Sequence, residues 1–401
     1  MNDFAARTYY KLIMTLASPL TVGSGNNINT DHDVIIDAQG KPFIPASTIA
    51  GVLRSYYPEE EGNRLFGYIR TDKGDKTEEK VSSIAVYDAY LESGCDACFI
   101  TTRDSVKLFE KVAVKGAKFD QEAVETGAVF VSYLELFDRE YESRVEEALS
   151  AMDCGVLRLG MKTTRGYGQV SLKVAKKRID SFDDYLAFDM MDEWQGAEEL
   201  ALTAFPTGRQ LRLSVECAGG ISIREYSTDI NMPDYKQLAL HNEDNTPVIP
   251  GTSWAGAFRE RFASFAGAQA AKELFGIVDE KTKETRKSRV LFSETQLSGG
   301  TYKDVTRNAI DRFSAATKDG ALYKERTYYN GKGDLVITFT NASEPYDISA
   351  FAACVADLSN GLMSVGGLAS VGRGIFAVRA VNGKTVQEES DLFEMVTEAL
   401  K

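Results

Sequence analysis

The sequence predicts an α+β protein made of two tandem domains, and two observations carry this prediction. The first is an internal repeat: Pro42–Arg54 (PFIPASTIAGVLR) recurs 205 residues later as Pro247–Arg259 (PVIPGTSWAGAFR). Five matches in the same order keep offsets between 204 and 209, which indicates duplication of a whole domain. The second is the order of elements in each half, strand, helix, strand, hairpin, helix and strand, which favours helices on one face of an antiparallel sheet. We place the domains at residues 1–200 and 201–401.

Length and composition fit this organisation. The chain has 401 residues, of which 43% are hydrophobic, enough to fill two cores. It has no run of about eighteen apolar residues, so we expect no membrane partner. Its start lacks the basic and then apolar pattern of a signal peptide, and its five cysteines suggest no disulfide framework. We therefore expect a cytoplasmic protein.

The net charge of −13 argues against a simple nucleic-acid-binding protein, which usually carries a basic excess. Basic residues nevertheless recur inside the repeated motifs, and an acidic body with a local basic track can bind a phosphate backbone. These residues are Arg54, Arg103, Lys162, Arg165, Arg259, Arg307, Arg312 and Arg373.

The first half begins with alternating apolar residues that predict a strand over Tyr9–Val22. A Gly/Asn/Asp-rich loop then leads into a short strand at Val34–Ile36. Because Pro45 cannot lie within a helix, Ser47 and Thr48 are the predicted N-cap of a helix through Arg54 and Tyr57. The later elements are a strand at Ile84–Leu91, an extended hairpin over Thr101–Val131, an amphipathic helix at Leu134–Ala151 and a glycine loop flanked by strands at Leu157–Leu172.

The second half repeats this order. The acidic segment Asp180–Glu199 connects the halves, and a strand at Gln210–Val215 restarts the pattern. A late helix is predicted at Phe351–Leu362. The chain closes with a helix at Asp391–Leu400, whose apolar residues recur at helical spacing.

The loop after the first strand gathers the acidic residues Asp31, Asp33 and Asp37 around His32. Clustered carboxylates can bind a divalent cation or accept a proton, although this spacing is not that of an EF-hand loop. The alternative is that these aspartates form turns. Only two histidines occur in the chain, which disfavours a histidine-based nuclease or catalytic triad.

Two motifs suit a phosphate group. The predicted helix start at Ser47 and Thr48 offers free backbone N–H groups and a partial positive charge, although a plain capped helix explains it too. The second motif is GMKTTRGYGQV from Gly160, which fits neither a Walker loop nor a dinucleotide fingerprint and is equally compatible with a tight hairpin turn. Its donors and its close-approach glycine are Lys162, Thr164, Arg165 and Gly166.

Cys95 and Cys98 form a lone C-x-x-C pair. Zinc would need two further ligands, which the sequence does not place nearby.

The combined pattern resembles the RAMP superfamily of CRISPR-associated proteins. It consists of a strand with a G-S-G loop, the D-x-D of Asp31–Asp33, then Ile44–Arg54 and the closing GMKTTRGYG. In the second half, SRVLFSE and TRNAIDRFSAATKDGALYKER look like backbone subunits of type III effector complexes of the Csm and Cmr type. Two such domains in one chain are similar to the fused backbone subunits of subtype III-D.

The resemblance implies a fold and a function. Each half would have an RRM-like (ferredoxin-like) core with a β-hairpin thumb, at roughly Thr101–Phe130 and Arg307–Thr338. The chain would stack along guide crRNA with other CRISPR effector subunits in a hetero-oligomeric filament, and its thumbs would insert between guide and target RNA. The implied RNA contacts are Ser47, Thr48, Arg54, Arg103, Lys162, Thr164, Arg165 and Gly166, then Thr252, Ser253, Arg259, Arg307, Arg312 and Arg373.

The resemblance also implies a candidate nuclease site. In the family, an acid in the loop after the first strand cuts target RNA with a divalent ion such as Mg²⁺. The matching position here is Asp31, which would also bind the metal, with Asp33 as the near alternative. The second half lacks the G-S-G loop, and its Asp229 and Asp234 do not align. The chain is therefore either an endoribonuclease acting on target RNA or a non-catalytic crRNA-binding scaffold.

Overall fold

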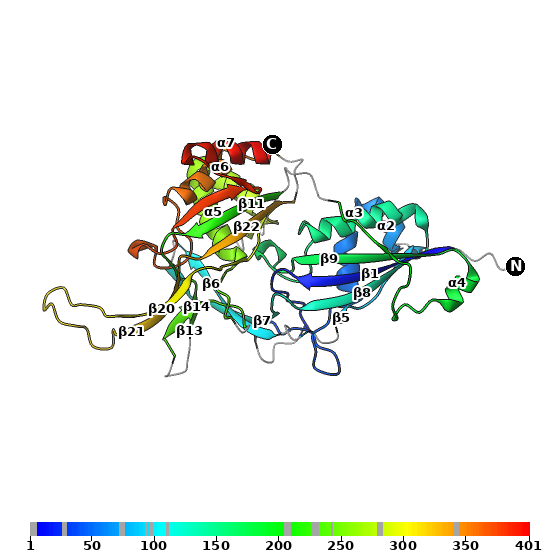
Figure 1. Cartoon of the computed structure of the whole chain (residues 1–401), viewed down its shortest axis with the longest axis horizontal. Coiled ribbons are helices and arrows are strands. Elements are labelled where there is room, and N and C mark those ends of the chain that lie inside the picture. Colours follow the sequence, from blue (N-terminus) through cyan, green and yellow to red (C-terminus); the bar gives the residue numbers. More distant parts are fainter. Residues whose placement is uncertain are drawn as a thin grey trace. The chain divides into compact units, whose positions relative to one another are not determined.

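The computed structural model describes residues 6–25, 30–71, 77–92, 95, 99–109, 112–203, 210–226, 232–241, 244–278, 284–340 and 345–401. The chain divides into two compact units, Met1–Thr163 with Tyr167–Phe205, and Thr164–Gly166 with Pro206–Lys401. Each unit has its own sheet and helices (Figure 1). Each also has its own hydrophobic core. No helix in the described part of the chain is long and apolar enough to cross a membrane.

The first unit is built on a six-stranded antiparallel sheet whose order is β10-β9-β1-β8-β4, with β5 also paired to β8. Without its short edge strands, the order β9-β1-β8-β4 is that of a ferredoxin-like β-α-β-β-α-β unit. The elements are β1 (Arg7–Leu16), α1 (Ala46–Arg54), α2 (Glu59–Phe66), β2 (Tyr68–Thr71), β3 (Thr77–Lys80), β4 (Ile84–Val86), β5 (Tyr90–Leu91), β6 (Ile100–Phe109), β7 (Val112–Val124), β8 (Val129–Leu136), α3 (Glu142–Asp153), β9 (Val170–Ile179), α4 (Phe182–Ala187) and β10 (Glu198–Glu199).

The second unit repeats this topology. Its sheet order, β18-β22-β11-β23-β24, places the equivalents of β4, β8, β1 and β9 in the same sequence. The elements are β11 (Gln210–Cys217), β12 (Gly220–Ile221), β13 (Arg224–Tyr226), β14 (Tyr235–Gln237), β15 (Val248–Ile249), α5 (Gly251–Phe275), β16 (Ile277–Val278), β17 (Thr285–Arg286), β18 (Val290–Phe292), β19 (Thr295–Gln296), β20 (Thr301–Arg307), β21 (Tyr323–Tyr329), β22 (Lys332–Phe339), α6 (Ile348–Ser359), β23 (Phe376–Val381), β24 (Lys384–Thr385) and α7 (Leu392–Leu400). The predicted α+β fold with two tandem ferredoxin-like units is confirmed.

Both units insert a β-hairpin at the same point of the chain, between the second and third strands of the core. The hairpins are β6–β7 in the first unit and β20–β21 in the second (Figure 1). The predicted thumb ranges extend beyond the C-terminal ends of the hairpins. Val129–Phe130 already belongs to β8, and Lys332–Thr338 to β22, and both strands pair with a central strand of the core sheet. Apolar and polar residues alternate in the hairpins and in the core strands alike, so this pattern alone does not show where a hairpin ends and a core strand begins.

The strand predicted at Tyr9–Val22 is β1, which confirms the alternation but ends at Leu16. Tyr10, Leu12, Met14 and Leu16 are all buried in the core on the helix-covered face. The predicted helix at Leu134–Ala151 is wrong in its first part, because Leu134 and Leu136 belong to strand β8 and the helix α3 begins at Glu142. A leucine pair two residues apart shares one face of a strand but not of a helix, and the pairing with β1 confirms the strand.

The helix pair α1–α2 of the first unit corresponds to α5 of the second. α5 is broken at Gly267, whose φ of 88° is not helical. Both pairs end at a glycine, Gly67 or Gly276, with φ near 75°. A Cβ there would lie 2.4 Å from Lys80 O or 2.6 Å from Arg286 O, so the chain needs glycine at both positions. The matching exits confirm that the repeat extends through the helices.

Candidate functional site

The start of α1 differs from its prediction. The N-cap is Pro45, with no side-chain cap, so Ser47 and Thr48 lie inside the first turn and the helix ends at Arg54 rather than Tyr57. The carboxylate of Asp88 accepts a hydrogen bond from the Ala46 N–H at 2.6 Å. A residue distant in the sequence thus supplies the negative charge that favours a helix N-terminus, and no local pattern indicated this contact.

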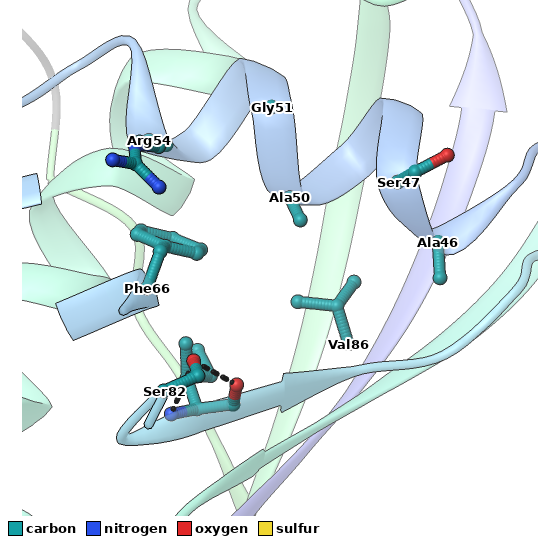
Figure 2. A pocket seen from close by; sticks show the side chains of 9 residues that line it. Ala46, Ser47, Ala50, Gly51, Arg54, Phe66, Ser82 and Val86 are labelled. Carbon is teal, nitrogen blue, oxygen red and sulfur yellow. Dashed lines mark hydrogen bonds between the residues drawn. The ribbon is translucent and has the colours of Figure 1, made fainter. Parts of the chain in front are cut away.

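One face of α1 is exposed and lined by small residues. Ser47 and Gly51 are exposed, Ala50 is half-buried, and a Cβ built on Gly51 would meet no atom within 4 Å. Beside this face lies a hollow of about 430 Å³. Figure 2 shows Ala46 and Ala50 on the helix side of the hollow, with Phe66 and Val86 across from them. Its remaining lining comes from Ser47, Gly51, Arg54, Ser82 and Ile84.

The second unit presents the same face. In α5, Thr252 and Gly256 are exposed and Ser253 is half-buried, and a Cβ on Gly256 also meets open space. A glycine inside a helix lowers its stability by roughly 0.5–1 kcal/mol relative to alanine. Packing within either unit does not require the two glycines. Both helices therefore leave room for a molecule that comes close to their backbone.

The closing arginines of the two motifs differ in their contacts. Arg54 donates from Nη1 to the Gly67 carbonyl at 2.9 Å and also binds the Asn63 side chain, so it ties α1 to the end of α2. Arg259 is exposed on α5. A role for either arginine in RNA binding stays a prediction.

The acidic loop after β1 separates the two candidate aspartates. Asp33 is buried, and its Oδ1 accepts hydrogen bonds from the Thr30 N–H at 2.9 Å and from the Thr30 hydroxyl at 3.0 Å. These contacts are typical of an aspartate that forms a turn, which is the alternative role given above. Asp37 likewise accepts from the Gln39 and Lys41 N–H groups. Asp31 is exposed. It is therefore the candidate that an external molecule can reach.

Asp31 is fastened to the hairpin by Asp120 of β7. The Asp31 N–H donates to Asp120 Oδ1, and the Asp120 N–H donates to Asp31 Oδ2, both at 3.1 Å. The loop is further held by Glu122, whose N–H donates to His32 O at 3.0 Å and whose carboxylate accepts from the Val34 N–H. Asp120 is a carboxylate neighbour of the candidate acid that the sequence did not indicate, because it lies 89 residues away.

Arg103 lies on β6, where it is buried. Its guanidinium binds the buried Glu125 carboxylate, with Nη2 to Oε2 at 2.9 Å, and the Thr101 hydroxyl donates to Glu125 Oε1 at 2.6 Å. This pair fixes the base of the first hairpin. The predicted RNA contact of Arg103 would therefore act through hairpin geometry.

The glycine loop places its predicted residues in different surroundings. Lys162 has φ of 55°, donates to the Gln121 side chain and lies 4.3 Å above the Phe119 ring. Arg165 is exposed, Thr164 is half-buried and Gly166 is buried. Thr164–Gly166 clusters with the second compact unit. Whether these residues bind RNA stays a prediction.

Arg158 was missed by the sequence analysis, because it sits between two leucines and reads as part of a strand. It is buried, and it donates to the carbonyls of Gly155 at 3.1 Å and Thr163 at 3.4 Å. Burial lowers the pKa of Arg158 to about 10, which leaves it charged at neutral pH. The guanidinium holds both ends of the segment that leads into the glycine loop.

In the second unit, Arg307 and Arg373 meet at one carboxylate. Glu325 of β21 is 1% exposed and accepts from Arg307 Nε at 2.8 Å and from Arg373 Nη2 at 3.2 Å. Arg373 is itself buried, whereas Arg312 is exposed in the loop between β20 and β21. Asp234 accepts from the Lys324 N–H at 2.6 Å, and Asp229 lies outside the described residues.

The structure describes one cysteine of the C-x-x-C pair. Cys95 accepts a hydrogen bond from the Val129 N–H at 3.4 Å, and Cys98 lies outside the described residues. Among the residues that the structure describes, no group of three or more His, Cys, Asp or Glu side chains could hold a metal ion.

The open face of the first sheet is covered by the segment that follows β9. Phe188 packs on Tyr9 with ring centroids 4.6 Å apart, and Trp194 packs on Phe188 at 5.3 Å and on Tyr133 at 6.0 Å. β10 then pairs with β9 at the sheet edge. This aromatic cover occupies the surface through which RRM-type sheets stack bases.

A family model described as the RAMP superfamily matches residues 13–171 and 230–377, one region in each half of the tandem repeat. The chain is also similar to a chain of a solved structure titled "Cryo-EM structure of the Type III-B Cmr-beta bound to cognate target RNA", with 16% identity and a TM-score of 0.33. That match covers 43% of this chain and 60% of the other, less than two thirds of its length. No curated protein matches the chain.

Proposed function

The chain belongs to the RAMP superfamily, and we propose that it is a backbone-type subunit of a type III CRISPR effector complex. In this proposal both units hold guide crRNA by its backbone and position complementary target RNA, alongside other effector subunits in the cytoplasm. Binding through the backbone suits a guide whose sequence varies.

The observation that carries the proposal is the repeated helix face of α1 and α5. At equivalent positions, each face combines an exposed hydroxyl, Ser47 or Thr252, with an exposed glycine, Gly51 or Gly256. Hydroxyl groups donate to phosphate oxygens, and a bare glycine lets a ribose-phosphate backbone approach the helix. Two copies of one face suit a ligand that repeats along its length, as RNA does.

The test is the affinity of the purified chain for a single-stranded RNA of about 40 nucleotides, at fixed salt concentration. Gly51→Leu and Gly256→Leu fill the open space at each face. Ala268→Leu is the matched control, because Ala268 is exposed on α5 outside the repeated motif. We expect each glycine variant to weaken binding about tenfold and the double variant to weaken it further. Equal affinities for the wild type, the control and the double variant would refute the proposal.

We also propose that Asp31 takes part in cutting target RNA, with the non-catalytic scaffold as the alternative. The Asp31 and Asp120 carboxylates are hard oxygen donors, which fits Mg²⁺ held by one or two carboxylates and RNA phosphates. When bound, such an ion would stabilise negative charge on the reacting phosphate. In the reconstituted complex with Mg²⁺, Asp31→Ala should abolish one cut while target binding persists. If Asp31→Ala, Asp33→Ala, Asp229→Ala and Asp234→Ala all leave every cut intact, the chain is a scaffold.

A further inference from the structure

The sheet that carries the second hairpin has an aromatic face. This sheet has the order β12-β21-β14-β13, with β20 paired to the other edge of β21 (Figure 1). Residues that are register partners, or two apart on one strand, share a face. By this rule Tyr226, Tyr235, Tyr323 and Tyr329 lie on the same side of the sheet. We call this side the tyrosine face.

Three of these rings form a continuous row. Tyr235 and Tyr323 stack with centroids 5.6 Å apart and planes inclined by 30°, and Tyr226 meets Tyr235 edge-on at 6.1 Å. Tyr226 ends the row and is 63% exposed. Burial raises the pKa of Tyr235 to about 12, so its ring stays neutral. The row thus ends in an accessible aromatic ring.

The tyrosine face is also basic. Arg224 lies 4.3 Å above the Tyr235 ring, and Lys303 and Arg373 lie 5.2 Å and 4.7 Å from the Tyr329 ring. Together with Arg307 these are four cations, and among the described residues of this face Glu325 is their one carboxylate. The opposite face is balanced instead, with the pairs Lys236–Glu225 and Arg326–Asp304. This excess of positive charge is local, because the whole chain has a net charge of −13.

We propose that the tyrosine face is a base-stacking site for unpaired nucleotides of RNA, with Tyr226 as the ring on which a nucleobase stacks. Aromatic rings bind every base through its π-face, and arginines beside them attract the phosphates. This inference rests on the proposed function and deepens it, since it assigns contact with the bases to the second unit. In the first unit, the cation–ring contact among the described side chains of the hairpin is that of Lys162 with Phe119.

The test uses the full chain with two probes of equal length, an oligouridylate and an abasic ribose-phosphate oligomer. Tyr226→Leu removes the ring, and Tyr226→Phe keeps it. Phe265→Leu is the matched control, because Phe265 is 47% exposed on α5 and lies 5.0 Å from the guanidinium of Arg261. We expect Tyr226→Leu to weaken oligouridylate binding about tenfold, while Tyr226→Phe and Phe265→Leu stay within about twofold of the wild type. Binding of the abasic probe should be unchanged in all variants.

The outcomes distinguish failure of the stacking site from failure of the proposed RNA-binding function. If the wild type binds oligouridylate and Tyr226→Leu binds it equally well, the stacking site is refuted and the RNA-binding proposal stands. If Tyr226→Leu weakens both probes alike, the residue supports the hairpin rather than a base, and the inference also fails. If the wild type binds neither probe, both the proposed function and this inference are refuted. Thermal unfolding checks that each variant is folded.

Discussion

Asp31 and Asp120 exchange hydrogen bonds, each backbone N–H donating to the carboxylate of the other residue at 3.1 Å. These bonds hold the loop after β1 against β7, so the candidate acid lies beside the first hairpin. A hairpin that contacts RNA would then align the acid with it.

Asp120 gives the first prediction. In the reconstituted complex, Asp120→Asn keeps an oxygen that can accept the Asp31 N–H but removes a charge, whereas Asp120→Ala removes both. If Asp120 helps to hold a divalent ion, Asp120→Asn should cut target RNA at least tenfold more slowly at low Mg²⁺ and recover as Mg²⁺ is raised. If it only positions the loop, Asp120→Asn should cut normally and Asp120→Ala slowly. Normal cutting by both variants would contradict either role.

Gly51 gives a prediction in which stability and binding move in opposite directions. Because Gly51 is helical and a Cβ there meets open space, Gly51→Ala should stabilise the first unit by about 0.5–1 kcal/mol. The same methyl group stands where we place the RNA backbone, so RNA affinity should fall. Denaturant unfolding and RNA titration measure the two effects. A stabilised variant with unchanged RNA affinity would remove Gly51 from the binding face.

Asp88 gives a third prediction, because its carboxylate sits at the N-terminus of α1 beside the proposed RNA path. Asp88→Asn keeps an acceptor for the Ala46 N–H and removes a negative charge, so RNA binding at low salt should tighten several-fold. Asp88→Ala should destabilise the first unit by about 1 kcal/mol, since the N–H loses its partner. Weaker RNA binding by Asp88→Asn would show that the carboxylate itself takes part.

The sequence predicted best where the local pattern decides the structure. The alternation of Tyr10, Leu12 and Leu16 identified β1, and the repeated motif identified the duplication that the two sheet orders confirm. The sequence-based prediction was wrong where a contact with a residue distant in the sequence decides the structure. Ser47 was the expected cap, but Asp88 provides the contact from 42 residues away.

The candidate site shows the same limit. The sequence analysis placed Arg103 and Arg373 among basic residues that could bind a phosphate backbone. Both are buried against glutamates, Glu125 and Glu325, that only the folded hairpins bring to them. Tyr226 and Tyr235 are nine residues apart, and nothing in their spacing indicates a ring pair. Strand pairing between β13 and β14 creates it.

Glu142 gives a prediction about acid stability. Burial alone raises its pKa, but Arg178, Lys176 and Thr8 donate to the carboxylate and together lower the pKa from its ordinary value of 4.5 to about 2. A carboxyl group with a lowered folded-state pKa stabilises the fold above its unfolded pKa, and this contribution, up to about 3 kcal/mol, is lost as pH falls through the folded value. Stability of the first unit should therefore decline between about pH 5 and pH 2.

Glu142→Gln tests this assignment, because it removes the titrating group and keeps the shape. The variant should be less stable than the wild type at pH 7, with a smaller further loss on acidification. Denaturant unfolding at a series of pH values measures both. An unchanged slope in Glu142→Gln would assign the acid sensitivity to other carboxylates.

We propose that RNA binds at the equivalent faces of both α1 and α5, and photocrosslinking tests this most directly. RNA carrying 4-thiouridine throughout would be irradiated in complex with the full chain, and the crosslinked peptides mapped by mass spectrometry. We predict crosslinks in both Ala46–Arg54 and the matching start of α5, Gly251–Arg259, at similar yield. Efficient crosslinking that maps elsewhere and spares both segments would contradict the account.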